Sequence, residues 1–200
     1  MYHVKNTNRL FQAVCAYYCL ALASSAGHEK YRYCENLNPQ NAISINLTTG
    51  IWYMIVVYNH RIKGEPMGQL LSVCPSINLT YANEHTDTEL NFLWKETVSS
   101  IEYQFKIIDI TSPGTWMSIG EQKGSVLALD NFKNFTGKVF VKKAVKDHMW
   151  LTFCSPDTYL YSLVLSRGER LRPRVMEGIN KLISMQQFPV SDQIWTSCGR

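Results

Sequence analysis

The stretch TTGIWYMIVVYNH, from Thr48 to His60, opens a long apolar run with a glycine and a tryptophan. The residues after Trp52 are mostly β-branched or aromatic, which is typical of a β-strand. A tryptophan buries on the order of 200 Å² of surface, and its indole N–H prefers a hydrogen-bond partner when it is buried. A tryptophan fixed near the start of a strand is therefore expected to fill a space in the fold, and the rest of the chain indicates which space.

The composition is that of an ordinary globular chain of 200 residues, with 46% apolar and 18% charged residues. This length supports one domain with a sizeable core, whereas two full domains would be crowded. The formal net charge of +4 is small, and its basic residues are dispersed along the sequence. Composition therefore argues against disorder and against nucleic-acid binding.

The first 26 residues have the pattern of a secretory signal peptide. Lys5 and Arg9 supply positive charge, an apolar run follows, and Ser24 and Ala26 stand at the positions that signal peptidase requires. We expect cleavage near Ala26, which leaves residues 27–200 as a single domain without a transmembrane segment, secreted and extracellular. A retained signal anchor is the alternative; no later stretch approaches the roughly 20 apolar residues of a membrane-spanning helix.

Cysteine usage agrees with an oxidising compartment. Cys34, Cys74, Cys154 and Cys198 remain after removal of the signal, and an even number of cysteines in a secreted chain predicts disulfides, with three pairings open. Their wide spacing, without a Cys-x-x-Cys pair or a histidine cluster, predicts no metal site. Three glycosylation sequons begin at the asparagines Asn46, Asn78 and Asn134.

Hydrophobic periodicity along the mature chain is mostly two, which predicts an antiparallel all-β domain. The segments between Gly, Pro, Asn and Asp residues are too short and too closely spaced for intervening helices, which favours a sandwich or a barrel. The expected strands are Gly50–Asn59, Cys74–Tyr81, Leu90–Thr97, Ile101–Ile110, Gly114–Ile119, Ser125–Leu129, Lys138–Val145, Met149–Cys154 and Tyr159–Ser166.

One helix is expected near the end of the chain, from Pro173 to Gln186. Proline fits the first helical position because its missing N–H has no partner there, and Pro189 stops the helix. The apolar face at helical spacing consists of Val175, Met176, Ile179, Leu182 and Ile183. An extended segment, QIWTSC, then carries Cys198.

Successive short strands, a late helix and a final extended segment resemble the order of elements in lipocalins. The GIWY sequence from Gly50 resembles the Gly-x-Trp motif of that family, and LYSLVLSRGERL, residues 160–171, resembles its last barrel strand. The resemblance implies an eight-stranded antiparallel up-and-down β-barrel with one C-terminal α-helix packed outside. It also implies that Arg167 packs over Trp52 and closes one end of the barrel, a cation–π contact worth about 0.5–2 kcal/mol.

The order of the cysteines is similar to that of insect-type lipocalins, the bilin-binding and apolipoprotein D-like group. This resemblance implies the bridges Cys34–Cys154 and Cys74–Cys198. One departure concerns the family's second motif, which is degenerate here as KKAVKDHMW, residues 142–150, with Asp147 as the remaining match. In the family, contacts with a cell-surface receptor or protein partner are often associated with the closed end of the barrel, where this motif lies. Because the motif is degenerate here, the resemblance assigns no residues to such a partner.

Strand alternation predicts which side chains line the barrel. Cys74 and Cys154 must point outward if they form these bridges, and polar residues such as Glu102 and Gln104 mark outer faces, so their neighbours point inward. This lining is apolar and aromatic, which suits a small hydrophobic ligand of the lipid, retinoid, pheromone or tetrapyrrole class. Alternatively, the side chains fill the barrel solidly. The expected ligand-binding residues are Met54, Val56, Tyr58, Ile77, Leu79, Tyr81, Leu90, Phe92, Trp94, Tyr103, Phe105, Ile107, Met149, Leu151 and Phe153.

Nothing in the sequence predicts an enzyme or a cofactor. His60, His85 and His148 are scattered, and such histidines are usually surface or loop residues; no nucleophile elbow, zinc motif or phosphate loop is present. The second hypothesis is a secreted protein-interaction or inhibitor protein, or a binder of biogenic amines. Asp109 has inward parity beside a loop expected at the open end, where it could meet a cationic ligand; the alternative is a solvated carboxylate at a strand end.

Overall fold

The computed structural model describes residues 34, 37–40, 42–60, 74–83, 86–128, 134–156, 160–186, 188, 190 and 192–199. The predicted signal segment, residues 1–26, and His85 lie outside these ranges. The chain divides into two compact units, Met1–Leu37 and Asn38–Arg200. All the elements described below belong to Asn38–Arg200.

Among the described residues of this unit strands dominate, with one α-helix and three short 3-10 turns. The elements, in chain order, are η1 (Ile45–Leu47), β1 (Gly50–Asn59), β2 (Ser76–Asn83), β3 (Thr86–Lys95), β4 (Ser100–Ile107), β5 (Thr115–Lys123), η2 (Ser125–Ala128), β6 (Lys138–Ala144), β7 (His148–Cys154), β8 (Leu160–Ser166), α2 (Pro173–Met185), β9 (Asp192–Trp195) and η3 (Ser197–Gly199).

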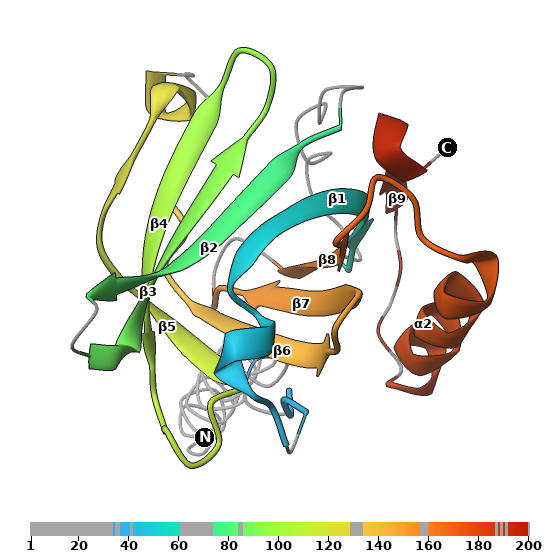
Figure 1. The fold of residues 1–200 in the computed structure, drawn as a ribbon, viewed down its shortest axis with the longest axis horizontal. Helices are drawn as coiled ribbons and strands as arrows, with labels where there is room; N and C mark the ends of the chain where they lie inside the picture. The colour runs from blue at the N-terminus through green and yellow to red at the C-terminus, as the bar shows by residue number, and fades with distance from the viewer. Residues whose placement is uncertain are drawn as a thin grey trace, which may run out of the picture. The chain divides into compact units, whose positions relative to one another are not determined.

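The strands form one antiparallel sheet that closes on itself. Consecutive strands pair from β2 through β8, and β1 pairs with both β8 and β2, which completes an eight-stranded up-and-down barrel (Figure 1). The first part of β1, Gly50–Tyr53, pairs with β2, whereas Val56–Asn59 pairs on the same edge with β9. The predicted fold class is confirmed, since β1 joins β8 to β2 and closes the sheet.

The C-terminal helix α2 packs outside the barrel, as predicted (Figure 1). Pro173 occupies its first turn, and the apolar stripe buries Met176, Ile179 and Ile183. The hydroxyl of Tyr58, on β1, donates a hydrogen bond of 2.5 Å to Oδ1 of Asn180. Apolar burial and this polar contact together attach the helix to the wall.

The prediction of a strand at Ser125–Leu129 is wrong, because residues 125–128 form the 3-10 turn η2. Gly124 precedes this turn with φ +137°, and a Cβ there would lie 2.2 Å from the carbonyl oxygen of Ser100. The Ser100 N–H donates to Oγ of Ser125, which ties the turn to the start of β4. The chain therefore folds back on β4 at this point instead of adding a strand.

The two rims of the barrel differ. At one rim, here called the η1 end, lie η1, the β4–β5 loop, the β6–β7 turn and Arg167 after β8. At the opposite end lie the β3–β4 turn, η2, residues 134–137 before β6 and the end of β7. Between the rims, the inward side chains of all eight strands form one apolar core.

Candidate functional site

The candidate site is the interior of the barrel. Most of the residues predicted to point inward are buried there in one contiguous core, and Tyr81 packs half-buried against it with its hydroxyl 2.7 Å from Oδ1 of Asn46. Their inward orientation is confirmed, whereas their role in ligand binding stays a prediction. The predicted residues in the core are Met54, Ile77, Leu79, Leu90, Phe92, Trp94, Tyr103, Phe105, Ile107, Met149, Leu151 and Phe153.

Val56 and Tyr58 were expected to point inward, and this expectation is wrong. The pairing of β1 with β8 shifts register between Met54 and Val56, which is a β-bulge at Ile55. One extra residue reverses the alternation, so Val57 joins the interior core and Tyr58 points outward to α2. Burial beneath the helix raises the pKa of Tyr58, and a hydrogen bond from Gln193 partly opposes this.

Aromatic rings meet across the centre of the barrel. The ring centroid of Phe92, on β3, lies 5.9 Å from that of Phe105, on β4, and 5.7 Å from that of Phe153, on β7. In the closed sheet β3 and β7 lie on opposite walls, so the contact between Phe92 and Phe153 spans the interior. These edge-to-face contacts fill the barrel at this level.

Further interior residues were not predicted. Those on β4 and β8, and Val139 and Val141 on β6, keep the regular alternation, so strand parity could have found them. The register of β6 shifts between Val141 and Lys143, so parity does not place Ala144, and no strand pattern marks Phe135, which lies in the segment before β6. Trp116 was missed although β5 was expected; its indole N–H donates to the Pro113 carbonyl across 2.9 Å. The additional core residues are Val57, Ile101, Trp116, Phe135, Val139, Val141, Ala144, Tyr161, Leu163 and Leu165.

The η1 end is closed by Trp52 and Arg167 in the arrangement that the family resemblance implies. The Arg167 guanidinium lies 3.5 Å from the Trp52 ring centroid and donates to the carbonyls of Ile51, Leu47 and Thr49 at 2.9, 3.1 and 2.6 Å. The Trp52 indole N–H donates to the Thr48 carbonyl across 2.7 Å. Trp52, which is fully buried, therefore plugs this end of the interior.

Gly50 allows this closure because it lacks a side chain. Its φ is +97°, which disfavours any residue with a Cβ. A Cβ at this position would lie 3.0 Å from Nη1 of Arg167. Glycine is therefore required both by the backbone conformation and by the close approach of the guanidinium.

The polar groups near the η1 end are structural. The Asp147 carbonyl accepts a hydrogen bond of 3.0 Å from the Arg167 N–H, and its carboxylate lies 2.7 Å from Nδ1 of His148, which lowers the pKa of Asp147. Asp109 also lies at the η1 end, not beside an open-end loop as expected, because β4 runs toward that rim. Its exposed carboxylate accepts hydrogen bonds from the Thr111 N–H and hydroxyl at 2.8 and 2.7 Å, so it does not face the interior.

Two histidines are buried, contrary to the expectation of surface positions. His60 lies on the outer side of the barrel wall, where its Nε2 is 2.8 Å from Oγ of Ser162 and its ring stacks on Phe188 at 4.8 Å. Among the described residues, no three His, Cys, Asp or Glu side chains gather as a metal site would require. No helix in the described ranges is long and apolar enough to cross a membrane.

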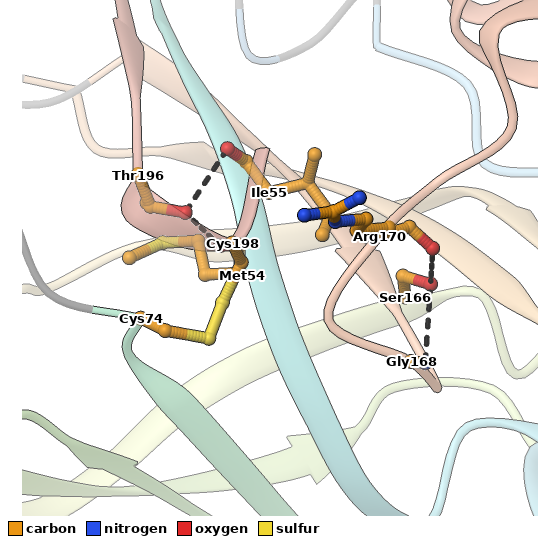
Figure 2. The surroundings of a disulfide bond; sticks show 8 residues. All are labelled: Met54, Ile55, Cys74, Ser166, Gly168, Arg170, Thr196 and Cys198. Atoms are coloured by element: carbon orange, nitrogen blue, oxygen red, sulfur yellow. Dashed lines mark hydrogen bonds between the residues drawn. A yellow bond between two sulfur atoms is a disulfide. The ribbon is translucent and has the colours of Figure 1, made fainter. Parts of the chain in front are cut away.

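One predicted bridge is confirmed. Cys74 and Cys198 form a disulfide with a Cα–Cα distance of 4.9 Å, which joins the chain before β2 to η3 (Figure 2). Cys34 and Cys154 are each disulfide-bonded as well; their pairing with each other stays a prediction. Of the sequon asparagines, Asn46 and Asn134 are exposed and Asn78 is half-buried on β2.

Comparison with known proteins supports the fold. No protein-family model matches the chain, and no curated protein matches it in sequence. The structure is similar to apocrustacyanin C2, with 10% identity, a TM-score of 0.50 and coverage of 76% of this chain and 78% of that one. It is also similar to the cockroach allergen Per a 4, with 10% identity, a TM-score of 0.55 and coverage of 82% and 93%. With the closed barrel and the outer helix, these likenesses show that the chain has the lipocalin fold.

Proposed function

We propose that the protein is a secreted carrier that binds a small hydrophobic ligand inside the barrel. The observation that carries this proposal is the interior itself, where inward apolar and aromatic side chains from every strand gather in a closed wall. Ligand sites for small molecules are concave and mostly apolar, with a few polar groups for orientation. The hydroxyls of Tyr103 and Tyr161 supply such groups among the interior residues.

The proposed entry is the end opposite η1. Contacts of 3.5 Å or less seal the η1 end, where Arg167 packs on Trp52 and binds the carbonyls of Leu47, Thr49 and Ile51. At the opposite end, Trp94 is 8% exposed, and its indole N–H donates to Oε1 of Glu96 across 3.2 Å. A ligand that enters here would lie close to the Trp94 indole, which supplies an intrinsic fluorescent reporter.

The test is a titration of delipidated protein with hexadecanoic acid, retinol and biliverdin, followed by tryptophan quenching. Phe92→Lys should abolish binding because it places a charge in the apolar interior. Leu93→Lys is the matched control, because the adjacent side chain points outward beside Glu102 and should leave affinity unchanged. Failure of all three ligands to saturate at micromolar concentration, in protein folded by circular dichroism, would rule out the carrier function.

The aromatic contacts across the barrel favour a second candidate, a secreted protein-interaction or inhibitor protein. Phe92, Phe105 and Phe153 already occupy the centre of the interior, as expected if the barrel is a solid scaffold. Native mass spectrometry of protein from its natural source separates the two candidates. A co-purifying hydrophobic molecule supports the carrier, whereas an empty barrel with a bound protein supports the scaffold.

Secretion and glycosylation are part of the proposal. Disulfide-bonded cysteines support an oxidising compartment, and the exposed Asn46 and Asn134 would be accessible to glycosylation. Expression in a secreting eukaryotic cell should yield protein in the medium whose N-terminus is Gly27. Digestion with an N-glycosidase should lower its mass, and Asn134→Gln should remove one glycan.

A further inference from the structure

Phe135 is an interior residue that does not come from a strand. It lies in the segment between β5 and β6, at the end opposite η1, and it is 3% exposed. Its neighbours Asn134 and Thr136 are both exposed. The segment is therefore a rim segment that inserts one aromatic side chain into the barrel.

The pairing between β5 and β6 is short where this segment lies. Strands β5 and β6 pair only at Thr115–Met117, although β5 continues to Lys123. Beyond that pairing, the Ser118 N–H donates to the Gly137 carbonyl across 2.9 Å, and the Gly137 N–H donates to the Ser118 hydroxyl across 2.9 Å. Residues 134–137 thus cover the edge of β5 that β6 does not reach.

The side chain of Gln122 binds both backbone groups of Phe135. Nε2 of Gln122 donates to the Phe135 carbonyl across 2.6 Å, and the Phe135 N–H donates to Oε1 of Gln122 across 3.0 Å. This amide stands in for a strand partner, since it satisfies both backbone groups of one residue. Release of Phe135 therefore includes the loss of these two hydrogen bonds to one half-buried residue, and Phe135 is not part of the pairing of β5 with β6.

The Phe135 ring occupies the part of the interior nearer the end opposite η1. Its centroid lies 5.3 Å from that of Phe153 on β7, 6.3 Å from Phe105 and 6.4 Å from Tyr103, both on β4. It packs on the ring cluster at the centre of the barrel from the side of the proposed entry. Of the rings in this cluster, Phe135 lies outside the strands, and so its withdrawal would leave the strand pairs of the barrel unchanged.

We propose that Phe135 is the gate residue of the barrel, and that a hydrophobic ligand must displace its ring to bind. This inference rests on the proposed carrier function. In the closed form the ring takes the place of the ligand. The apparent association constant is therefore the intrinsic one multiplied by the fraction of molecules in which the ring is withdrawn. The Gln122 side chain lowers that fraction, because its two hydrogen bonds stabilise the closed form.

The test measures retinol binding by stopped-flow fluorescence in four proteins of the full mature chain. Phe135→Ala removes the ring and should raise the association rate and the affinity about tenfold or more. Gln122→Ala keeps the ring but removes its restraints, and should raise the association rate in the same direction; it also serves if Phe135→Ala is poorly folded. Phe188→Ala is the matched control, an equal truncation of a buried ring that packs outside the barrel on His60.

The outcomes separate the gate from the carrier function. Faster and tighter binding in both variants, with the control unchanged, supports the gate. Binding by the natural protein that neither variant alters overturns the gate and leaves the carrier function standing. Binding only after Phe135→Ala supports occlusion by Phe135 but contradicts a carrier role for the natural chain. Absence of binding in every folded variant overturns both.

Discussion

The backbone N–H of Thr196 donates to the carbonyl oxygen of Ile55 across 3.1 Å, and this contact holds the bulge in β1. The Thr196 hydroxyl adds hydrogen bonds to the carbonyls of Met54 and Ile55. A bulge leaves backbone groups outside the regular ladder, and the C-terminal segment satisfies them here. Cys198, two residues further on, is bonded to Cys74, so the disulfide fixes the segment that stabilises the bulge.

Thr196→Val should destabilise the fold by about 1–3 kcal/mol, because valine keeps the shape of threonine but leaves the Met54 carbonyl buried without its hydroxyl donor. Urea unfolding followed by tryptophan fluorescence measures the loss. Hydrogen exchange should also accelerate in β9, which Thr196 attaches to β1. Thr80→Val, at an exposed position on β2, is the control; an equal loss in both variants would contradict a specific role for Thr196.

The same bulge explains where prediction from sequence succeeded and where it failed. Regular alternation placed Ile77 and Leu79 on β2 and Phe92 on β3 correctly, because an uninterrupted strand exposes successive side chains to opposite faces. Beyond Ile55 the same rule gave the wrong face for Val56 and Tyr58. The bulge is stabilised by Thr196, which is about 140 residues away, and no local pattern in β1 reports that contact.

Phe135 shows a second limit of the sequence. Strand parity identifies inward residues only within strands, and this ring enters the interior from a rim segment held by Gln122. Gly50, Trp52 and Arg167, by contrast, could be predicted, because a short motif at each end of the barrel sequence marks their positions. Motifs and periodicity thus predicted the barrel and its closed end, while the gate depends on tertiary contacts that neither encodes.

Arg167→Ala should lower the free energy of unfolding by about 2–4 kcal/mol, since it removes a cation–π contact and three charged hydrogen bonds. Arg167→Lys should recover only part of this loss, because an ammonium lacks the planar fork that reaches several carbonyls at once. Chemical denaturation measures both variants. Arg174→Ala, exposed at the start of α2, is the control for loss of charge; full recovery by lysine would show that charge alone matters.

Removal of the Cys74–Cys198 bridge should destabilise the protein by about 2–5 kcal/mol. The bridge closes a long loop, with a sequence separation of 124 residues, and loop-closure entropy grows with loop length. The double variant Cys74→Ser with Cys198→Ser should unfold at lower temperature in calorimetry and lose protection from hydrogen exchange first in β9 and η3. Protection lost uniformly across the barrel would instead indicate that the bridge stabilises no particular segment.

Lys142 should make the free energy of unfolding increase with pH in the alkaline range. It is buried on β6, where Nζ donates to the Asn38 carbonyl across 2.6 Å and lies 5.6 Å from the Phe188 ring centroid. Burial lowers the pKa of Lys142 from 10.5 to about 8. Below pH 8 both the folded and the unfolded protein carry this charge, and the folded state bears the cost of burying it.

As pH rises from 8 to 10.5, the folded protein releases this proton before the unfolded protein does. The contribution of Lys142 to the free energy of unfolding therefore rises with pH. Lys142→Met removes the titrating group at similar length. Urea unfolding at intervals across this window should show the natural protein gaining stability relative to Lys142→Met as pH increases. Lys143→Met, at the half-exposed neighbouring position, reports the loss of a charge alone; the same pH dependence in both differences would show that burial of Lys142 is not its cause.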